Sequence, residues 1–302
     1  MYQHMLGQVA SFGERVSPDR LGEAPARSNL LEDLPRQRHL RRSVPAGCVP
    51  IYLVCHDRYN PLVRREIVER LLEINRGFYQ SFAEPFSETR SQLQPGVLRA
   101  IQDLPEHARV LDLGCGHGAL AAHLHEHGFR GTYLGLDGSE ALLDRIPSNL
   151  RPPTYRFFHA DLADHGWPKR IDSPTDRFDR VCAFAVLHHL PTEQLRLAII
   201  TATRGLLDPA GRLVMSVWDF LSSLRLRKRI VPWENVGLDQ QDVDAEDYLL
   251  DWRQGGTGFR YVHHFSGQEL RSLAAQAGFS VLAEYQADRG LGLYQVWQPS
   301  LA

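Results

Sequence analysis

The feature that most constrains the fold is a glycine-rich segment that directly follows an apolar run. Residues 109–114 read Arg-Val-Leu-Asp-Leu-Gly and predict a buried strand, and residues 112–118 read Asp-Leu-Gly-Cys-Gly-His-Gly. Residues 119–127 predict the helix that follows. Glycines permit the left-handed backbone of a tight loop, and the first turn of a helix has unpaired N–H donors. The pattern therefore predicts a ligand site at the carboxyl end of this strand.

Strands and helices alternate along the rest of the chain. Further strands are predicted at residues 132–137, 155–161, 178–186, 211–218, 279–285 and 291–297, and helices at residues 139–145, 192–207 and 266–277. Such alternation is typical of a mostly parallel sheet with helices on both faces. We therefore predict an α/β fold, a Rossmann-like, doubly wound sheet of seven strands.

Other parts of the chain differ in composition. Residues 1–58 combine arginines, acids and scattered prolines, so we predict a disordered extension. A start site placed too far upstream would leave the same composition, and a transit peptide is a weaker alternative because such peptides are poor in acids. Residues 59–104 predict helices that cover the site, with one stretch at 77–86. Residues 105–302 form the main domain, and we predict an irregular insertion at 219–265.

Composition excludes several classes of protein. The hydrophobic share is 43% and the charged share 23%, as in soluble globular proteins. No run of about 18 apolar residues predicts a transmembrane helix. The net charge of −2 argues against a basic surface over the whole chain for duplex nucleic acid. Because the four cysteines form no C-x-x-C pair, we expect no metal site and a cytoplasmic location.

Acidic residues lie in or just after the first three predicted strands. Asp112 precedes the first glycine and suits a ligand with a cationic amino group, because it would repel a pyrophosphate. Asp137 ends the next strand, where an acid accepts hydrogen bonds from ribose hydroxyls, although it also fits a helix N-cap. Asp161 follows the third strand and is placed to accept from an exocyclic amine. The G-x-G-x-G spacing disfavours both a phosphate loop and a nicotinamide dehydrogenase.

These residues resemble the class I S-adenosylmethionine-dependent methyltransferases. The resemblance covers about residues 105–299 and implies the sheet order 3-2-1-4-5-7-6, with the last strand antiparallel. It implies S-adenosyl-L-methionine as the cofactor, with its methionine part at Asp112 and the glycines, its ribose at Asp137 and its adenine at Asp161. The expected cofactor-binding residues are Tyr79, Arg90, Asp112, Gly114, Gly116, Gly118, Asp137, Asp161, Leu162 and Ala185.

Four further segments narrow the resemblance, at residues 78–90, 185–190, 231–233 and 260–265. Over about residues 75–275 the chain looks like the tRNA wobble-uridine carboxymethyl methyltransferases, which methylate the carboxylate of 5-carboxymethyluridine. This resemblance implies the tRNA anticodon loop as a partner and, by analogy, a small zinc-binding activator subunit.

The same segments supply the expected catalytic and substrate-binding residues. Arg90 is suited to clamp a carboxylate, either the cofactor's or the substrate's. A carboxylate acceptor needs no general base, whereas an amine or phenol could lose its proton to His188. A platform for a flipped base could combine aromatic stacking with an arginine. The expected catalytic residues are His188, Arg90 and Arg260, and the expected substrate-binding residues are His188, His189, Trp233, Arg260, Tyr261 and His263.

A dense basic cluster follows the fifth strand, made of Arg225, Arg227, Lys228 and Arg229. It suits phosphate binding and a solvated face equally. The insertion also carries six acids, which predict a small RNA footprint or none: Asp239, Asp242, Asp244, Glu246, Asp247 and Asp251. Two other functions therefore stay open, a methyltransferase for a small metabolite and a non-catalytic cofactor-binding module.

Overall fold

The computed structural model describes residues 64–300, apart from residues 91, 151–152 and 172–176. All of them belong to one structural unit, residues 51–302. The extension predicted to be disordered, residues 1–58, lies outside the described residues. None of the helices in the described ranges is long and apolar enough to cross a membrane.

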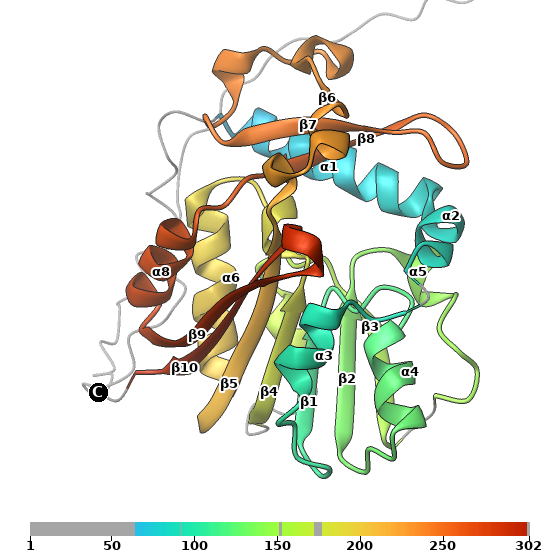
Figure 1. Ribbon diagram of the computed structural model, residues 1–302, viewed down its shortest axis with the longest axis vertical. Coiled ribbons are helices and arrows are strands. Elements are labelled where there is room, and N and C mark those ends of the chain that lie inside the picture. Colours follow the sequence, from blue (N-terminus) through green and yellow to red (C-terminus); the bar gives the residue numbers. More distant parts are fainter. Residues whose placement is uncertain (1–63, 91, 151–152, 172–176, 301–302) are drawn as a thin grey trace, which may run out of the picture. The chain divides into compact units, whose positions relative to one another are not determined.

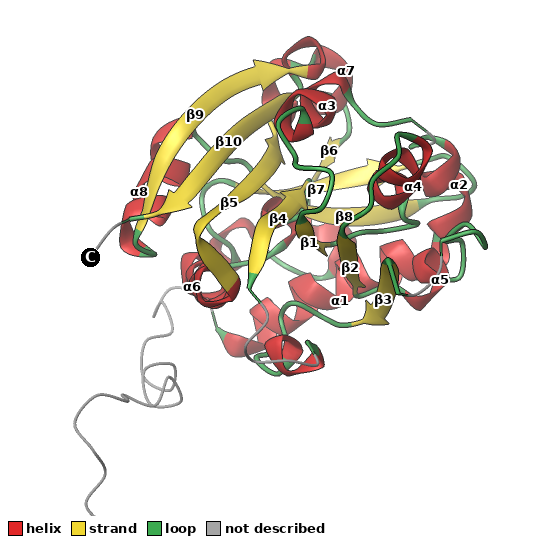
Figure 2. Ribbon diagram, turned by 90° about the horizontal axis from the view of Figure 1, so that it is seen from below, coloured by secondary structure: helices red, strands yellow, loops and turns green. Residues whose placement is uncertain are grey.

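A seven-stranded sheet forms the centre of this unit (Figure 2). Its strands are β1 (Arg109–Leu113), β2 (Thr132–Asp137), β3 (Tyr155–His159), β4 (Phe178–Phe184), β5 (Leu207–Trp218), β9 (Phe279–Ala287) and β10 (Gly292–Pro299). The order is β3-β2-β1-β4-β5-β10-β9. The first five strands pair in parallel, and β10 runs antiparallel to both β5 and β9. The predicted fold class and strand order are confirmed.

Helices cover both faces of the sheet, because successive side chains of each buried strand point to opposite faces. On one face Val110 of β1 packs with α3 (Pro95–Ile101) and α4 (Ala119–Glu126). On the other face Leu111 packs with α6 (Glu193–Leu206) and α8 (Gly267–Gln276). The two hydrophobic clusters fix the sheet rigidly and hold the carboxyl ends of its strands in place.

The helix after β2 is shorter than the sequence predicts. Helix α5 spans only Glu140–Leu143, and Ser139 caps it by accepting a hydrogen bond from the Leu142 N–H.

The N-terminal helices also differ from the prediction. Helix α1 (Arg65–Ser81) continues through Gly77, and the break before α2 (Ala83–Glu88) comes at Phe82. The prediction that a second helix begins at residue 77 was therefore wrong.

The insertion is not irregular, contrary to the prediction. It contains the short helix α7 (Leu224–Arg227) and an antiparallel sheet of β6 (Ile230–Val231), β7 (Asp247–Trp252) and β8 (Gly258–His263). Buried positions of β7 and β8 carry polar side chains, so these segments lack the alternation of apolar and polar residues that predicts a strand.

Helix α1 packs on this small sheet through a cluster that contains Leu71, Leu249 and Tyr261. Together, α1 and the small sheet lie across the carboxyl ends of the central strands (Figure 1).

Candidate active site

A cavity of about 670 Å³ lies between the carboxyl ends of the central strands and the layer formed by α1 and the small sheet. Its wall includes ten of the residues predicted for the site, namely Tyr79, Arg90, Gly114, Gly116, Asp137, Asp161, Leu162, Ala185, His189 and Arg260. The volume falls within the range of small-molecule sites. Residues from distant parts of the chain thus meet at one place.

The glycine loop after β1 presents bare backbone to this cavity. Gly114, Gly116 and Gly118 have φ angles of +71°, +56° and +80°, which side chains disfavour. A Cβ on Gly114 would lie 2.5 Å from the Cγ2 atom of Val186, whereas a Cβ on Gly116 would meet no atom within 4 Å. The loop is therefore packed tightly behind Gly114 and open at Gly116, where a ligand can approach the backbone.

Asp137, at the end of β2, ties this loop to the next turn. Its carboxylate accepts hydrogen bonds of 2.8 Å from the Gly116 N–H and from the Ser139 N–H, one on each oxygen. Burial raises the pKa of Asp137, and these two N–H groups oppose that shift. Each oxygen keeps a further lone pair for ligand hydroxyls.

Asp161 is already engaged by the protein. Its Oδ2 accepts a 2.7 Å hydrogen bond from the Arg76 Nε, and its Oδ1 accepts one of 2.8 Å from the Ala163 N–H. The pair joins α1 to the end of β3. The role of Asp161 as an acceptor for an adenine amine stays a prediction.

Asp112 and Gly118 do not line the cavity. Asp112 is buried and accepts a hydrogen bond from the Tyr133 hydroxyl, and burial raises its pKa to about 7. Asp112 lies behind the loop, and its predicted contact with the amino group of the cofactor stays a prediction. Gly118 instead forms the left-handed N-cap of α4.

Two guanidinium groups face the cavity, and neither has an acidic partner in the part of the chain that the structure describes. Arg260, on β8, is 4% exposed, and its Nε and Nη1 atoms make no hydrogen bond. Its Cζ atom lies 4.8 Å, 4.8 Å and 5.1 Å from the ring centroids of Phe78, Trp218 and Trp252. The Arg90 Cζ lies 5.9 Å from the same Trp218 ring.

Arg90 and Arg260 together give this part of the cavity a positive charge, which suits an anionic ligand. Burial lowers the pKa of Arg260, Tyr79 opposes that shift, and the charge of Arg90 lowers the pKa further. Burial also lowers the pKa of Arg90, as does the charge of Arg225. Within the described ranges, no carboxylate forms an ion pair with any of these three arginines. A buried cation without a counter-ion is costly, so an anionic ligand would stabilise it.

Neutral groups complete this side of the wall. The carbonyl of Tyr261 lies 3.1 Å from Nδ1 of His189, so that nitrogen carries the proton. The other nitrogen, Nε2, then accepts the 2.7 Å hydrogen bond from the Tyr79 hydroxyl. Burial lowers the pKa of His189 to about 3, which keeps the ring neutral. The Tyr79 side chain also interacts with Arg260 and raises the pKa of that guanidinium.

His188 does not reach the cavity, which corrects its predicted roles in catalysis and substrate binding. It is fully buried and stacks on Trp218 with ring centroids 5.0 Å apart. Neither ring nitrogen has a hydrogen-bond partner, and burial holds its pKa well below the usual value. His188 is therefore a neutral packing residue rather than a base.

The predicted base-stacking platform is also largely structural. Trp233 is buried in the cluster between α1 and the small sheet, and Tyr261 donates a 2.8 Å hydrogen bond to Asp247. His263 lies between Asp247 Oδ1, at 2.7 Å, and Glu269 Oε1, at 2.9 Å. Of that group, the structure leaves only Arg260 facing the cavity.

The structure adds site residues that the sequence did not single out. Trp218 and Trp252 line the cavity and flank Arg260. Asn75 donates 3.1 Å hydrogen bonds to the carbonyls of His189 and Tyr261 and accepts one of 2.9 Å from the Tyr261 N–H. An asparagine on the apolar face of α1, after Leu71 and Leu72, was the signal that could have revealed it. Among the described residues, no group of three or more His, Cys, Asp or Glu is placed to hold a metal ion.

Comparison with known proteins defines the class. A family model described as a methyltransferase domain matches residues 86–284, and the chain belongs to that family. It is a class I S-adenosylmethionine-dependent methyltransferase, and S-adenosylmethionine is its cofactor. The tRNA (carboxymethyluridine(34)-5-O)-methyltransferase of Schizosaccharomyces pombe is 27% identical over 227 residues, which cover 70% of this chain and 90% of that protein.

Other relatives are similar over a smaller part. The tRNA (carboxymethyluridine(34)-5-O)-methyltransferase alkbh8 of Xenopus tropicalis is 28% identical over 142 residues, which cover 46% of this chain and 20% of that protein. This chain thus matches about a fifth of that relative's length. Among solved structures, a DhpI complex with S-adenosylhomocysteine has a TM-score of 0.54 at 19% identity, over 78% of this chain and 99% of that one.

A Haloferax volcanii methyltransferase in complex with the Trm112 methyltransferase activator also has a TM-score of 0.54, at 15% identity, over 75% of this chain and 98% of that one. Both structural likenesses show the shared fold.

Proposed function

We propose that this enzyme methylates a carboxylate of a modified wobble uridine in tRNA. The observation that carries the proposal is a pair of guanidinium groups, Arg90 and Arg260, that form no ion pair within the described residues and lie in a cavity that also contains the glycine loop and Asp137. A carboxylate is one of the anions that an arginine fork binds with two parallel hydrogen bonds. The similarity to the Schizosaccharomyces pombe enzyme, which acts on carboxymethyluridine in tRNA, supports the same acceptor.

The glycine loop and Asp137 fit the cofactor. The open backbone at Gly116 leaves room for the methionine part, and the free lone pairs of Asp137 suit ribose hydroxyls. When bound, the cofactor supplies an electrophilic methyl group. The role of these residues is to fix its position and to exclude water.

The groups around Arg260 fit the acceptor. A carboxylate is ionised at neutral pH, so its oxygen can attack without a general base. The neutral His189 and the buried His188 agree with this absence of a base. Trp218 and Trp252 hold the Arg260 guanidinium by their ring faces and leave its Nε and Nη1 atoms unpaired. The carboxylate of the acceptor would bind this guanidinium through one oxygen and place its second oxygen toward the methyl group.

The direct test is methyl transfer to a defined RNA. The protein is incubated with S-adenosylmethionine and an anticodon stem-loop that carries 5-carboxymethyluridine, with and without a Trm112-type activator. Nucleoside mass spectrometry should show the methyl ester, and a stem-loop with plain uridine should stay unmodified. An unchanged carboxymethyl stem-loop in both conditions would contradict the proposal.

A small carboxylic acid is the second candidate acceptor. The layer of α1 and the small sheet encloses a cavity of about 670 Å³, which suits small ligands, and the chain is nearly neutral. Methyl transfer to a small acid from a metabolite extract, with no transfer to the RNA, would select this candidate.

A further inference from the structure

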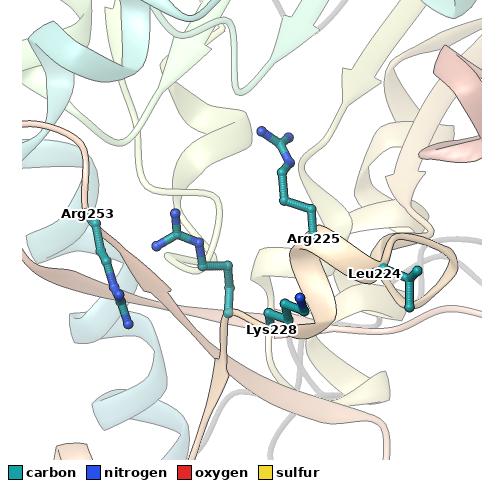
Figure 3. A pocket seen from close by; sticks show the side chains of 5 residues that line it. Leu224, Arg225, Lys228 and Arg253 are labelled. Carbon is teal, nitrogen blue, oxygen red and sulfur yellow. The ribbon is translucent and has the colours of Figure 1, made fainter.

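A second, strongly basic pocket of about 450 Å³ lies beside the active-site cavity. It is lined by Leu224, Arg225, Lys228, Arg229 and Arg253. Figure 3 shows Arg225 and Lys228, from α7 and its C-cap, on one side and Arg253, which follows β7, on the other. Four cationic side chains therefore surround one open pocket.

The positive charge of this pocket is only partly neutralised. Asp251, which is 7% exposed, pairs with both Arg229, at 3.3 Å, and Arg253, at 2.6 Å. Arg225 and Lys228 form no ion pair with an acid of the described ranges. One carboxylate thus faces four cations, and the excess attracts a polyanion.

The pocket adjoins the active-site cavity at Arg225. Arg225 lines both, and Leu226 and Trp252, which adjoin basic-pocket residues in sequence, line the active-site cavity. A ligand that fills the active site and extends past Arg225 would therefore enter the basic pocket. A nucleotide in a strand has this form, since a phosphate follows each nucleoside.

The acids of the insertion do not oppose an anion as strongly as the sequence suggested. Asp242 pairs with Arg64 at 2.9 Å, and Asp247 is buried beside Tyr261 and His263. Asp251 is held between two arginines of the pocket itself. Three of the six acids are thus occupied within the protein, which weakens the basis for the prediction of a small RNA footprint or none.

We propose that this basic pocket binds the phosphodiester groups next to the nucleoside that is methylated. The proposal rests on the proposed function for its choice of RNA as the ligand. The pocket is small and adjoins a cavity with tryptophan rings, which favours a single RNA strand over the broad surface of an acidic protein. The basic pocket would supply affinity, while the active-site cavity would select the modified base.

The test compares RNA binding of Lys228→Ala and Arg253→Ala with that of Arg130→Ala. Arg130 is a matched control because it is 72% exposed, pairs with Glu106 and lies just before β2, at the opposite end of the sheet. The probe is a fluorescent anticodon stem-loop RNA, and anisotropy is recorded over a range of salt concentrations. Binding of S-adenosylhomocysteine to each variant checks that the protein is folded.

Each basic-pocket variant should bind the stem-loop more weakly and lower the slope of log Kd against log salt concentration by about 0.7–1. Arg130→Ala should change neither quantity. Equal effects in all three variants, or none in the first two, would overturn the proposal, as would binding of polyglutamate but not RNA. Anisotropy measures RNA binding and needs no methyl transfer, so the two proposals can fail separately. If the protein does not methylate the stem-loop but the basic-pocket variants lose RNA binding, only the proposed function is refuted.

Discussion

Arg260 is a buried cation that forms no ion pair within the described residues, and we propose that the acceptor carboxylate pairs with it. We expect Arg260→Gln to lower kcat/KM for the carboxylate acceptor by about 30- to 1000-fold, or about 2–4 kcal/mol, because an ionic contact to the acceptor is lost. Arg260→Lys should not restore activity, since a lysine cannot offer two parallel donors. Steady-state kinetics with the carboxymethyl stem-loop measure both variants.

A stability measurement provides the control for this prediction. An unpaired buried charge destabilises the free protein, so Arg260→Gln should leave its Tm unchanged or raise it. A Tm several degrees lower would show that Arg260 serves the fold. Arg271→Gln removes an exposed arginine that pairs with Glu284, and it should leave kcat/KM unchanged.

Gly114 and Gly116 differ in what surrounds them, and that difference can be tested. Gly114→Ala combines a left-handed backbone with a clash against Val186, so it should cost well over 1 kcal/mol of unfolding free energy. Gly116→Ala meets no neighbour and should cost only about 1 kcal/mol, yet its methyl group enters the cavity. Urea unfolding should rank Gly114→Ala as less stable, and calorimetry should show weaker S-adenosylhomocysteine binding for Gly116→Ala. The reverse order would contradict this view of the loop.

His263 links pH to stability. Burial lowers its pKa, but the hydrogen bonds to Asp247 and Glu269 outweigh that effect and raise the pKa above 6.5. Because the folded state binds the proton more tightly, the stabilisation is complete below about pH 6.5 and is lost as pH rises through the folded pKa. Urea unfolding of the unmodified protein and of His263→Asn should differ most near pH 6 and less at pH 9. A difference that grows with pH would contradict the assignment.

At the scale of elements, Asn75 attaches α1 to the main domain and to the small sheet. Asn75→Leu leaves the carbonyls of His189 and Tyr261 and the Tyr261 N–H without their partner, which should cost about 2–4 kcal/mol. Hydrogen exchange should accelerate at β8 and α1 before it does so in the central strands. Asn235→Ala is the control, because that exposed side chain bonds only locally to Pro232. Uniform acceleration over the whole sheet would contradict this role.

At the scale of the whole molecule, the sequence predicts what depends on local pattern. The buried strands β1 and β2 are largely apolar runs that end at a glycine or an acid, and the spacing of the strands suffices for the fold and the glycine loop. Side-chain contacts between distant segments cannot be predicted from the local pattern of the sequence. The Arg76–Asp161 pair and the burial of His188 behind Trp218 depend on how α1 and β5 pack, which no local pattern shows.

The small sheet is the clearest example of this limit. Its strands place Asp247, Arg260 and His263 at buried positions. From the local sequence alone, such polar residues predict a loop or contacts with a substrate. Only the tertiary structure shows that Asp247 and His263 satisfy each other, whereas Arg260 forms no ion pair with the described residues. Once the fold is known, these polar residues can be assigned: Asp247 and His263 serve the structure, and Arg260 is a candidate for function.

The central claim is that Arg90 and Arg260 hold the acceptor carboxylate beside the methyl donor. A crystal structure with S-adenosylhomocysteine and 5-carboxymethyluridine tests it most directly. We predict the carboxylate within hydrogen-bond distance of the Arg260 guanidinium, with the adenosine ribose on Asp137. A carboxylate bound elsewhere, with both guanidinium groups still unpaired, would contradict the account.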